Sequence, residues 1–395
     1  MRKILLAVFG TFVFVLTGAA LRAQAPTSAE ATAGKPADLI MFVGTYTKAP
    51  SKGIYVYRFQ EATGEVTPLG AGGLAAETEN PSFLAVHPNQ RFLYAVNEIS
   101  KYEGMDAGSV SAFSIDRATG TLTLLNRVST RGGSPCHLEL DRSGKWLFVA
   151  NYGGGSVAAF PVQDDGKLGE ASAFFQHAGK GANASRQSGP HAHETVVSPD
   201  NKFVLAADLG LDRVFSYRLD AAKGGLAPDP GFAALAPGSG PRHLAFRPDG
   251  KFVYVLNEMV SSVAAFRYDA GRGTLAEVQT ISTLQLGSTT ENSGAEIATH
   301  PSGKFLYASN RGQDSIATFR IDAAKGTLTS VHRMSTQGKT PRGFGIDPSG
   351  RFLVAGNQNS GTLVVFRIDQ RTGELTSTGT VIQVGSPVNV VFSKR

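Results

Sequence analysis

One hairpin phrase returns seven times along the chain, and this repeat limits the folds that the chain can adopt. The clearest copy runs from Gly240 to Glu258, where two apolar strands flank the turn Pro248-Asp249-Gly250. Pro presets φ at such a turn and Gly accepts its left-handed position. The second strand of each copy ends roughly 50 residues after the previous one. These end positions are Thr45, Asn97, Asn151, Asp208, Asn257, Asn310 and Asn357.

Each unit continues with an alternating strand, a turn and a fourth strand, as in residues 262–268, 269–273 and 274 onward. Four short strands per period of about 50 residues are typical of a β-propeller blade. Residues 41–46 form a second strand without a first, and residues 387–392 form a first strand without a second. We therefore expect an all-β, seven-bladed β-propeller over residues 39–395, closed by N- and C-terminal strands that share one blade.

Composition agrees with this fold and excludes some functions. The chain has 46 Gly and 42% hydrophobic residues, which suits tight turns around a real core. Its formal net charge of +6 is mild, and no dense Lys/Arg run occurs, so we expect no nucleic-acid partner. Cys136 is the single cysteine, which excludes a disulfide framework and covalent c-type haem.

The N-terminus follows the plan of a secretory signal peptide. Arg2 and Lys3 precede an apolar run that reaches about Ala20, and small residues end at Ala25. We assign residues 1–25 to the signal and residues 26–38, which are small and polar, to a flexible linker. Pro26 disfavours cleavage directly after Ala25, and retention of the run as an anchor is the alternative. The expected location is outside the cytoplasm, periplasmic or extracellular, with no membrane association after cleavage.

Two positions of the repeat vary in chemistry while the scaffold around them repeats. The first ring, aligned with Arg242, also contains Ser82, Cys136, His193, Ala295, Arg342 and Val388. The second ring, aligned with Glu258, also contains Tyr46, Glu98, Tyr152, Leu209, Arg311 and Gln358. Because inner strands of a propeller surround a channel and loops at one mouth make its site, these rings predict a polar funnel.

Four residues of the funnel are the strongest candidates for chemistry. His193, Arg242, Glu258 and Arg311 come from three consecutive units and are expected to meet at one mouth. The Arg242–Glu258 pair has two interpretations: a structural ion pair across one hairpin, or a cation for a substrate anion with a carboxylate that orients the base. The recurring Asn residues at the strand ends, by contrast, are expected to hold loops.

The remaining histidines divide by position. His191 and His193 lie on one face of an extended segment, a spacing that suits a metal, but no further ligand cluster accompanies them. We therefore expect acid–base chemistry and no metal or other cofactor. His87 and His300 precede Pro at the opposite hairpin turns and are expected at the surface.

Cys136 and His137 are adjacent and invite comparison with a nucleophile and its base. Neighbouring residues on a strand point to opposite faces, which argues against that pair, so Cys136 is expected to be a small buried side chain. His137 and His243 lie one residue past the first ring and fit either substrate contact or structure. The Gly-rich stretch after Tyr152 joins two strands and is a weak phosphate signal.

Several phrases, in order, resemble the lactonase family of seven-bladed propellers, which includes propeller-type 6-phosphogluconolactonases and fungal carboxymuconate-lactonising enzymes. The matching phrases lie at residues 134–137, 149–153, 189–193, 240–243, 256–258, 309–311, 341–342 and 356–358. The resemblance implies a catalytic His, two Arg and a Glu, which map onto His193, Arg242, Arg311 and Glu258. His191 is the alternative for His193.

The resemblance implies a hydrolase that opens a sugar-acid lactone by general acid–base catalysis, with a small, anionic substrate. The residues expected to bind that substrate are His137, His191, His243, Arg342, Glu98 and Tyr152. A muconate-type lactonising cycloisomerase and a non-catalytic exported propeller that binds an anionic ligand or protein are the alternatives. The export signal departs from the cytosolic setting of phosphogluconolactonases. The sequence does not indicate an oligomeric state.

Overall fold

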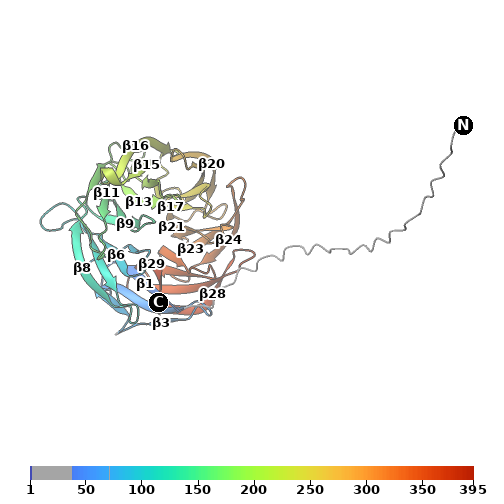
Figure 1. Ribbon diagram of the computed structural model, residues 1–395. Helices are drawn as coiled ribbons and strands as arrows, with labels where there is room; N and C mark the ends of the chain where they lie inside the picture. The colour runs from blue at the N-terminus through green and yellow to red at the C-terminus, as the bar shows by residue number, and fades with distance from the viewer. Residues whose placement is uncertain (2–37, 71) are drawn as a thin grey trace. The chain divides into compact units, whose positions relative to one another are not determined.

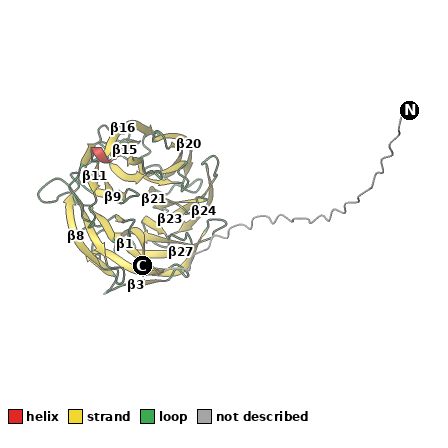
Figure 2. Cartoon of the chain, in the orientation of Figure 1, coloured by secondary structure: helices red, strands yellow, loops and turns green. Residues whose placement is uncertain are grey.

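The computed structural model describes Met1, residues 38–70 and residues 72–395. Within them, seven antiparallel sheets form a closed ring, which confirms the expected seven-bladed β-propeller (Figure 1). Strands dominate these residues, and a short 3-10 helix, η1 (Ala221–Lys223), interrupts them (Figure 2). The predicted leader and linker lie outside the described residues, apart from Met1 and Asp38. In the described part, no helix is long and apolar enough to cross a membrane.

Blades 1 to 6 are four-stranded sheets whose strands run outward from the channel in chain order. Blade 1 contains β5 (Leu84–Val86), β6 (Phe92–Asn97), β7 (Ser109–Ile115) and β8 (Leu122–Ser129). Blade 2 contains β9 (Pro135–Leu140), β10 (Trp146–Asn151), β11 (Ser156–Pro161) and β12 (Ala173–Gln176). Blade 3 contains β13 (Ala192–Val197), β14 (Phe203–Asp208), β15 (Arg213–Asp220) and β16 (Gly225–Ala234).

The later blades repeat this order. Blade 4 contains β17 (Pro241–Phe246), β18 (Phe252–Asn257), β19 (Ser262–Asp269) and β20 (Thr274–Ser282). Blade 5 contains β21 (Ser293–Thr299), β22 (Phe305–Arg311), β23 (Ser315–Ile321) and β24 (Leu328–Ser335). Blade 6 contains β25 (Pro341–Ile346), β26 (Phe352–Asn357), β27 (Thr362–Ile368) and β28 (Leu375–Gln383).

Blade 7 joins the two ends of the chain. Its strands are β29 (Pro387–Lys394), β1 (Asp38–Thr45) and β2 (Gly53–Gln60), with β3 (Val66–Pro68) and β4 (Leu74–Glu77) both paired to β2. The innermost strand comes from the C-terminus, and it pairs antiparallel with β1 from Leu39↔Lys394 to Thr45↔Pro387. The predicted shared blade is therefore confirmed.

Apolar side chains fill the gaps between neighbouring blades. Seven buried clusters occur among the described residues, and each draws its members mainly from two adjacent blades. Tyr94 of blade 1 and Phe160 of blade 2, for example, share one cluster and are fully buried. Burying one large apolar side chain is worth about 1.5–3 kcal/mol. Interblade packing of this kind explains how the ring holds together without a disulfide.

The recurring Asn residues fasten the loops at the mouth, as predicted. The Asn151 amide donates to Thr130 O at 3.2 Å and to Ser156 Oγ at 3.1 Å. The Asn257, Asn310 and Asn357 amides donate to the corresponding hydroxyl oxygens in their own units. A side-chain amide at this point ties the strand that ends to the strand that begins.

His87 and His300 correct an expectation, because both are buried rather than at the surface, with exposed fractions of 9% and 2%. Each ring spans the gap to the next blade: His87 Nε2 lies 3.0 Å from Gly144 O, and His300 Nε2 lies 2.7 Å from Gly350 O. The neighbouring turn covers the imidazole, which a single hairpin sequence does not reveal. Gly350 has φ +71°, and a Cβ there would lie 2.6 Å from His300 Nε2.

Candidate active site

β-bulges aim the first ring into the channel. The strand register skips Arg242, since Pro241 pairs with Asn257 and His243 with Leu256. The same shift occurs at the corresponding position in β9, β13, β21, β25 and β29. An extra residue at a bulge breaks the alternation of faces and re-aims side chains. Arg242 and His243 therefore both contact acidic residues of the channel although they are adjacent in sequence.

The mouth contains a cavity of about 350 Å³ that combines the two rings. Hollows of about 630 and 870 Å³ also open on the structure, but the smaller cavity holds the concentration of titratable groups. Its lining is Glu98, Cys136, Tyr152, Arg186, His193, Glu258, Ser293, Arg311 and Arg342. The geometry thus brings together residues of blades 1 to 6 that are far apart in sequence, as the alignment of the repeats predicts.

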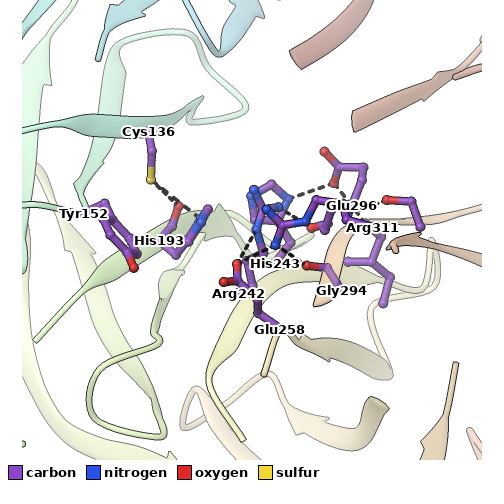
Figure 3. A network of polar contacts seen from close by, with 12 residues as sticks. Cys136, Tyr152, His193, Arg242, His243, Glu258, Gly294, Glu296 and Arg311 are labelled. Atoms are coloured by element: carbon purple, nitrogen blue, oxygen red, sulfur yellow. Dashed lines mark hydrogen bonds and ion pairs between the residues drawn. The ribbon is translucent and has the colours of Figure 1, made fainter. Parts of the chain in front are cut away.

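Glu258 is the centre of the charged network, and three guanidinium groups share its carboxylate. Figure 3 labels two of these residues, Arg242 and Arg311. Oε2 lies 3.1 Å from Arg242 Nε and 2.9 Å from Arg311 Nη2, while Oε1 lies 2.6 Å from Arg186 Nη2. Burial opposes ionisation of this carboxyl, but Arg311 and Arg242 outweigh it and lower its pKa to about 2. Glu258 is therefore ionised throughout the neutral range and cannot serve as a base there.

The arginines of the network differ in what they can touch. Arg242 is only 2% exposed, and it bonds Glu258 and the carbonyl of Ala295 from behind the cavity. Arg311 lines the cavity but is held by Glu258 and by Gly294 O at 2.7 Å. Arg242, expected to be catalytic, does not line the cavity, so its catalytic role stays a prediction.

Arg342 differs from the other guanidinium groups of the cavity in its lack of an ion pair among the described residues. It lines the cavity, lies 5.3 Å over the Tyr46 ring, and has a buried Nε without a hydrogen-bond partner. Within the described residues it makes no ion pair, because the nearby Glu98 accepts instead from Tyr46 Oη at 2.8 Å. A partly buried cation without a carboxylate partner is costly unless an anion completes it. Arg342 is accordingly the best-placed group for a negative charge.

His193 is the uncharged imidazole that lines the cavity. Its ring is 4% exposed and packs edge-on against Tyr152 at 5.3 Å. Burial lowers the pKa of His193 well below its ordinary value, and the Arg242 charge adds to this. Nδ1 lies 3.6 Å from Cys136 Sγ, which leaves Nε2 as the ring nitrogen free to act.

A second layer of ionisable groups lies at the residues that follow the bulges. His137 Nε2 lies 3.1 Å from Glu194 Oε1, and His243 Nδ1 lies 2.9 Å from Glu296 Oε1. Burial raises the pKa of Glu296 to about 7 and lowers that of His243, so this pair favours a shared proton over separated charges. Neither histidine lines the cavity, so substrate contact by His137 or His243 stays a prediction without geometric support.

Of the other residues predicted to bind substrate, some line the cavity and one does not. Glu98 and Tyr152 line the cavity, as expected of substrate-binding residues. His191 does not: its ring stacks on Tyr152 at 4.6 Å and its Nδ1 lies 3.0 Å from Tyr152 O. His191 therefore packs against Tyr152, and His193 is the histidine of this pair that lines the cavity. The described residues contain no group of three His, Cys, Asp or Glu side chains fit to hold a metal ion.

Arg186 was not anticipated from the sequence. It belongs to the segment between β12 and β13, which lies outside the repeated phrases, and its side chain is 43% exposed. The segment is anchored by the buried Gln187, whose amide donates to Leu209 O and Asp212 Oδ1, both at 2.8 Å. The available signal is length, because the interval between Asn151 and Asp208 is the longest between repeat positions.

The charges and the base together define what the mouth can do. Four guanidinium groups face two carboxylates, so the cavity carries an excess of positive charge that suits an anionic group or a developing oxyanion. The six groups are Arg186, Arg242, Arg311, Arg342, Glu98 and Glu258. An uncharged imidazole beside such cations can accept a proton from water while they stabilise the negative charge that forms.

Comparison with known proteins supplies the family. The family model described as "Lactonase, 7-bladed beta-propeller" matches residues 40–392. A 6-phosphogluconolactonase of Bacillus subtilis is 40% identical over 308 residues, which cover 78% of this chain and 85% of that protein. A 6-phosphogluconolactonase of Formosa agariphila is 38% identical over 314 residues, which cover 78% of this chain and 86% of that protein.

A solved structure agrees with these sequence matches. The periplasmic gluconolactonase of Pseudomonas aeruginosa superimposes with a TM-score of 0.83 and 37% identity, over 90% of this chain and 99% of that one. None of these relatives favours a cycloisomerase or a binding module. The chain belongs to the lactonase family of seven-bladed β-propellers.

Proposed function

We propose that this protein is an exported hydrolase that opens the lactone ring of sugar acids in the cavity at the propeller mouth. One observation carries the proposal: the uncharged His193 and the unpaired guanidinium of Arg342 line the same 350 Å³ cavity. Relatives described as 6-phosphogluconolactonases and as a gluconolactonase support the substrate class.

The reaction begins with water held beside His193. Nε2 takes a proton from the water as its oxygen bonds to the lactone carbonyl carbon, and the carbonyl oxygen becomes an oxyanion. Arg342 donates hydrogen bonds to that oxyanion, and Arg311 adds positive charge from the neighbouring wall. Donors of this kind are each worth about 10²–10³ in rate when they are pre-positioned.

The ring opens when the tetrahedral intermediate collapses. The bond between the carbonyl carbon and the ring oxygen breaks, and the His193 imidazolium returns its proton to that oxygen as a hydroxyl group. The new carboxyl group loses its proton to solvent, so one proton is released for each lactone opened. Glu258 contributes by holding Arg311 and Arg186 in place, since its low pKa keeps it ionised.

Charge and location define the substrate more closely. The excess of guanidinium groups supports a substrate or product that carries a carboxylate or phosphate. Export rests on the leader pattern of residues 1–25 and agrees with the periplasmic location in the Pseudomonas relative's description. Cell fractionation followed by N-terminal sequencing of the mature protein tests it, and a cytoplasmic chain that retains residue 1 would contradict it.

Proton release above the spontaneous rate tests the activity. Purified protein is offered glucono-1,5-lactone and 6-phosphogluconolactone, each with and without a chelator, with His193→Gln as the matched control. We expect acceleration of at least one lactone, unaffected by the chelator and lost in the variant. A folded protein that accelerates neither would overturn the proposed function.

A further inference from the structure

Cys136 and His193 occupy the same ring position on neighbouring blades, and their side chains meet. The Cys136 sulfur lies 3.2 Å from the carbonyl oxygen of His193 and 3.6 Å from its Nδ1 (Figure 3). Both residues are at β-bulges, and both are more than nine-tenths buried. The contact joins β9 to β13 directly behind the proposed base.

The proton on sulfur has one good acceptor. Burial raises the pKa of the Cys136 thiol, and Glu98 adds to this, so the sulfur carries its hydrogen at neutral pH. The register skips His193, so its carbonyl oxygen lies outside the ladder between β13 and β14, and the thiol is the donor it meets. The S–H group therefore donates to His193 O, which is the nearer of the two acceptors and has no other donor from the ladder.

The direction of the S–H bond determines what the sulfur presents to His193 Nδ1. With its hydrogen directed to the carbonyl, sulfur presents a lone pair toward Nδ1, and a lone pair on Nδ1 would face it unfavourably. A hydrogen on Nδ1 makes the contact attractive, since sulfur is a weak acceptor. In a neutral imidazole the other nitrogen, Nε2, then holds the lone pair.

We propose that Cys136 is a positioning residue that holds His193 in its Nδ1–H tautomer, so that Nε2 faces the cavity as a base. The other tautomer would present N–H to the water and could not take its proton. The tautomer stands on the contact geometry alone, whereas its effect on rate rests on the proposed lactone hydrolysis. The thiol is not a nucleophile here, because its hydrogen is committed to a carbonyl and Nδ1 offers it no lone pair.

Imidazole ¹⁵N NMR of the full protein reads the tautomer without any substrate. The ring nitrogens of neutral histidine differ strongly in chemical shift according to which one bears hydrogen. His300 provides an internal reference of opposite sense, because its Nδ1 accepts from Ser302 N at 3.1 Å and its Nε2 donates to Gly350 O. His193→Gln assigns the His193 signals by their loss.

We expect wild-type His193 to show Nδ1–H and His300 to show Nε2–H. Cys136→Ala removes the acceptor and should move His193 toward Nε2–H, while Cys136→Ser, which keeps a donor and an acceptor, should retain Nδ1–H. Ser82→Ala is the matched control: it also removes a buried polar group from the first ring, but the Ser82 hydroxyl has no hydrogen-bond partner among the described residues. That control should leave the His193 signals unchanged.

Kinetics give a second readout. Cys136→Ala should lower kcat by about 10- to 100-fold with KM unchanged, which is part of the 10²–10⁴ that a general base supplies. Cys136→Ser should recover most of it, and thermal melting should confirm that all variants fold. A wild-type Nε2–H tautomer, or an unchanged His193 tautomer in Cys136→Ala, would overturn the proposal.

The two proposals fail separately. A protein that opens no lactone but shows the expected tautomers removes the proposed function and leaves the Cys136 assignment intact. Mass spectrometry of the quenched reaction adds a further check. An acyl group on Cys136 during turnover would make the thiol a nucleophile and would overturn the positioning role.

Discussion

The two ends of the inner hairpins contain buried histidines of opposite character. At the turn end, His87 and His300 each accept from a backbone N–H through Nδ1 and donate to the next blade through Nε2. At the mouth, the His193 ring has a weak partner, the Cys136 sulfur, and keeps a nitrogen for the cavity. Full satisfaction of a buried group indicates structure, and an unsatisfied one beside a cavity indicates function. The difference can be tested with matched pairs of variants.

The largest effect should follow loss of the Glu258 charge. Glu258→Gln leaves three guanidinium groups without their shared carboxylate, and breaking a buried ion pair costs about 3–5 kcal/mol. We expect that loss in urea unfolding, together with a fall in kcat/KM of about 10³ or more, because each misplaced donor is worth about 10²–10³. At the turn end, Asp347→Asn should lower stability and leave kcat/KM unchanged, since Asp347 accepts from Ser349 and Phe352 N, far from the mouth. Equal losses of activity in Glu258→Gln and Asp347→Asn would contradict the functional difference between the mouth and the turn end.

The histidine pair gives the sharpest separation. His193→Gln should lower kcat by about 10²–10⁴ through loss of the base, with stability changed by less than about 1 kcal/mol. His300→Gln should leave kcat unchanged and reduce the free energy of unfolding by about 1–3 kcal/mol, because its backbone partners become buried and unpaired. Steady-state kinetics and thermal melting of both variants measure the two effects. The distinction between the two histidines is wrong if both variants lose activity or both lose stability.

Arg342→Met should separate activity from stability in one residue. The rate should fall by about 10²–10³ through loss of the oxyanion donor, while stability stays level or rises, since a partly buried cation without a carboxylate partner is removed. The control at the turn end is Arg351→Met, because its ion pair with Glu61 is long, at 3.9 Å, and therefore weak. It should change neither quantity by much. A destabilised Arg342→Met protein would show that Arg342 is structural.

Arg186→Ala should have a smaller effect. The side chain is 43% exposed, so its ion pair with Glu258 is worth at most about 1 kcal/mol to stability. Loss of one positive charge from the rim should reduce kcat/KM about 10-fold or less, mainly through KM, with a weaker dependence on salt than the wild type shows. An unchanged KM for an anionic lactone would remove Arg186 from the substrate-binding surface.

The smallest effect is the pH dependence of stability at the mouth. Burial lowers the pKa of His193 in the folded state, so the unfolded chain binds more protons below about pH 6.5. Stability from this group is therefore complete above that pH and is lost as the pH falls toward the folded value. Each tenfold difference in proton affinity between the folded and unfolded states is worth about 1.4 kcal/mol of stability. Denaturation of wild type and His193→Gln between pH 7 and pH 5 should diverge accordingly, and parallel curves would show that the pKa of His193 is the same in both states.

The sequence predicts the repeating part of this molecule well. The number of blades, the shared seventh blade and the hydrogen bonds of the recurring Asn residues all follow from a sequence pattern that repeats about every 50 residues. Each copy has the same apolar strands and turn residues and therefore folds in the same way. The convergence of His193, Glu258 and Arg311 follows from the same alignment. Their catalytic roles stay predictions.

What the sequence does not reveal lies between the repeats. Arg186 belongs to a segment that no other blade contains among the described residues, so its approach to Glu258 depends on the path of a loop. The burial of His87 and His300 depends on the turn of the next blade, which the hairpin's own residues do not specify. Cys136 is buried, as expected, but its contact with His193 of the next blade is not specified by its own hairpin.

The pairing of β29 with β1 also orders events in time. The strand that completes the ring, Pro387–Lys394, follows the strands of blades 1 to 6 in the chain, so synthesis reaches it after them. Until it emerges, β1 has no inner neighbour and the circle has a gap where blade 7 should meet blade 6. A nascent chain of this design therefore cannot close its ring before β29 has emerged.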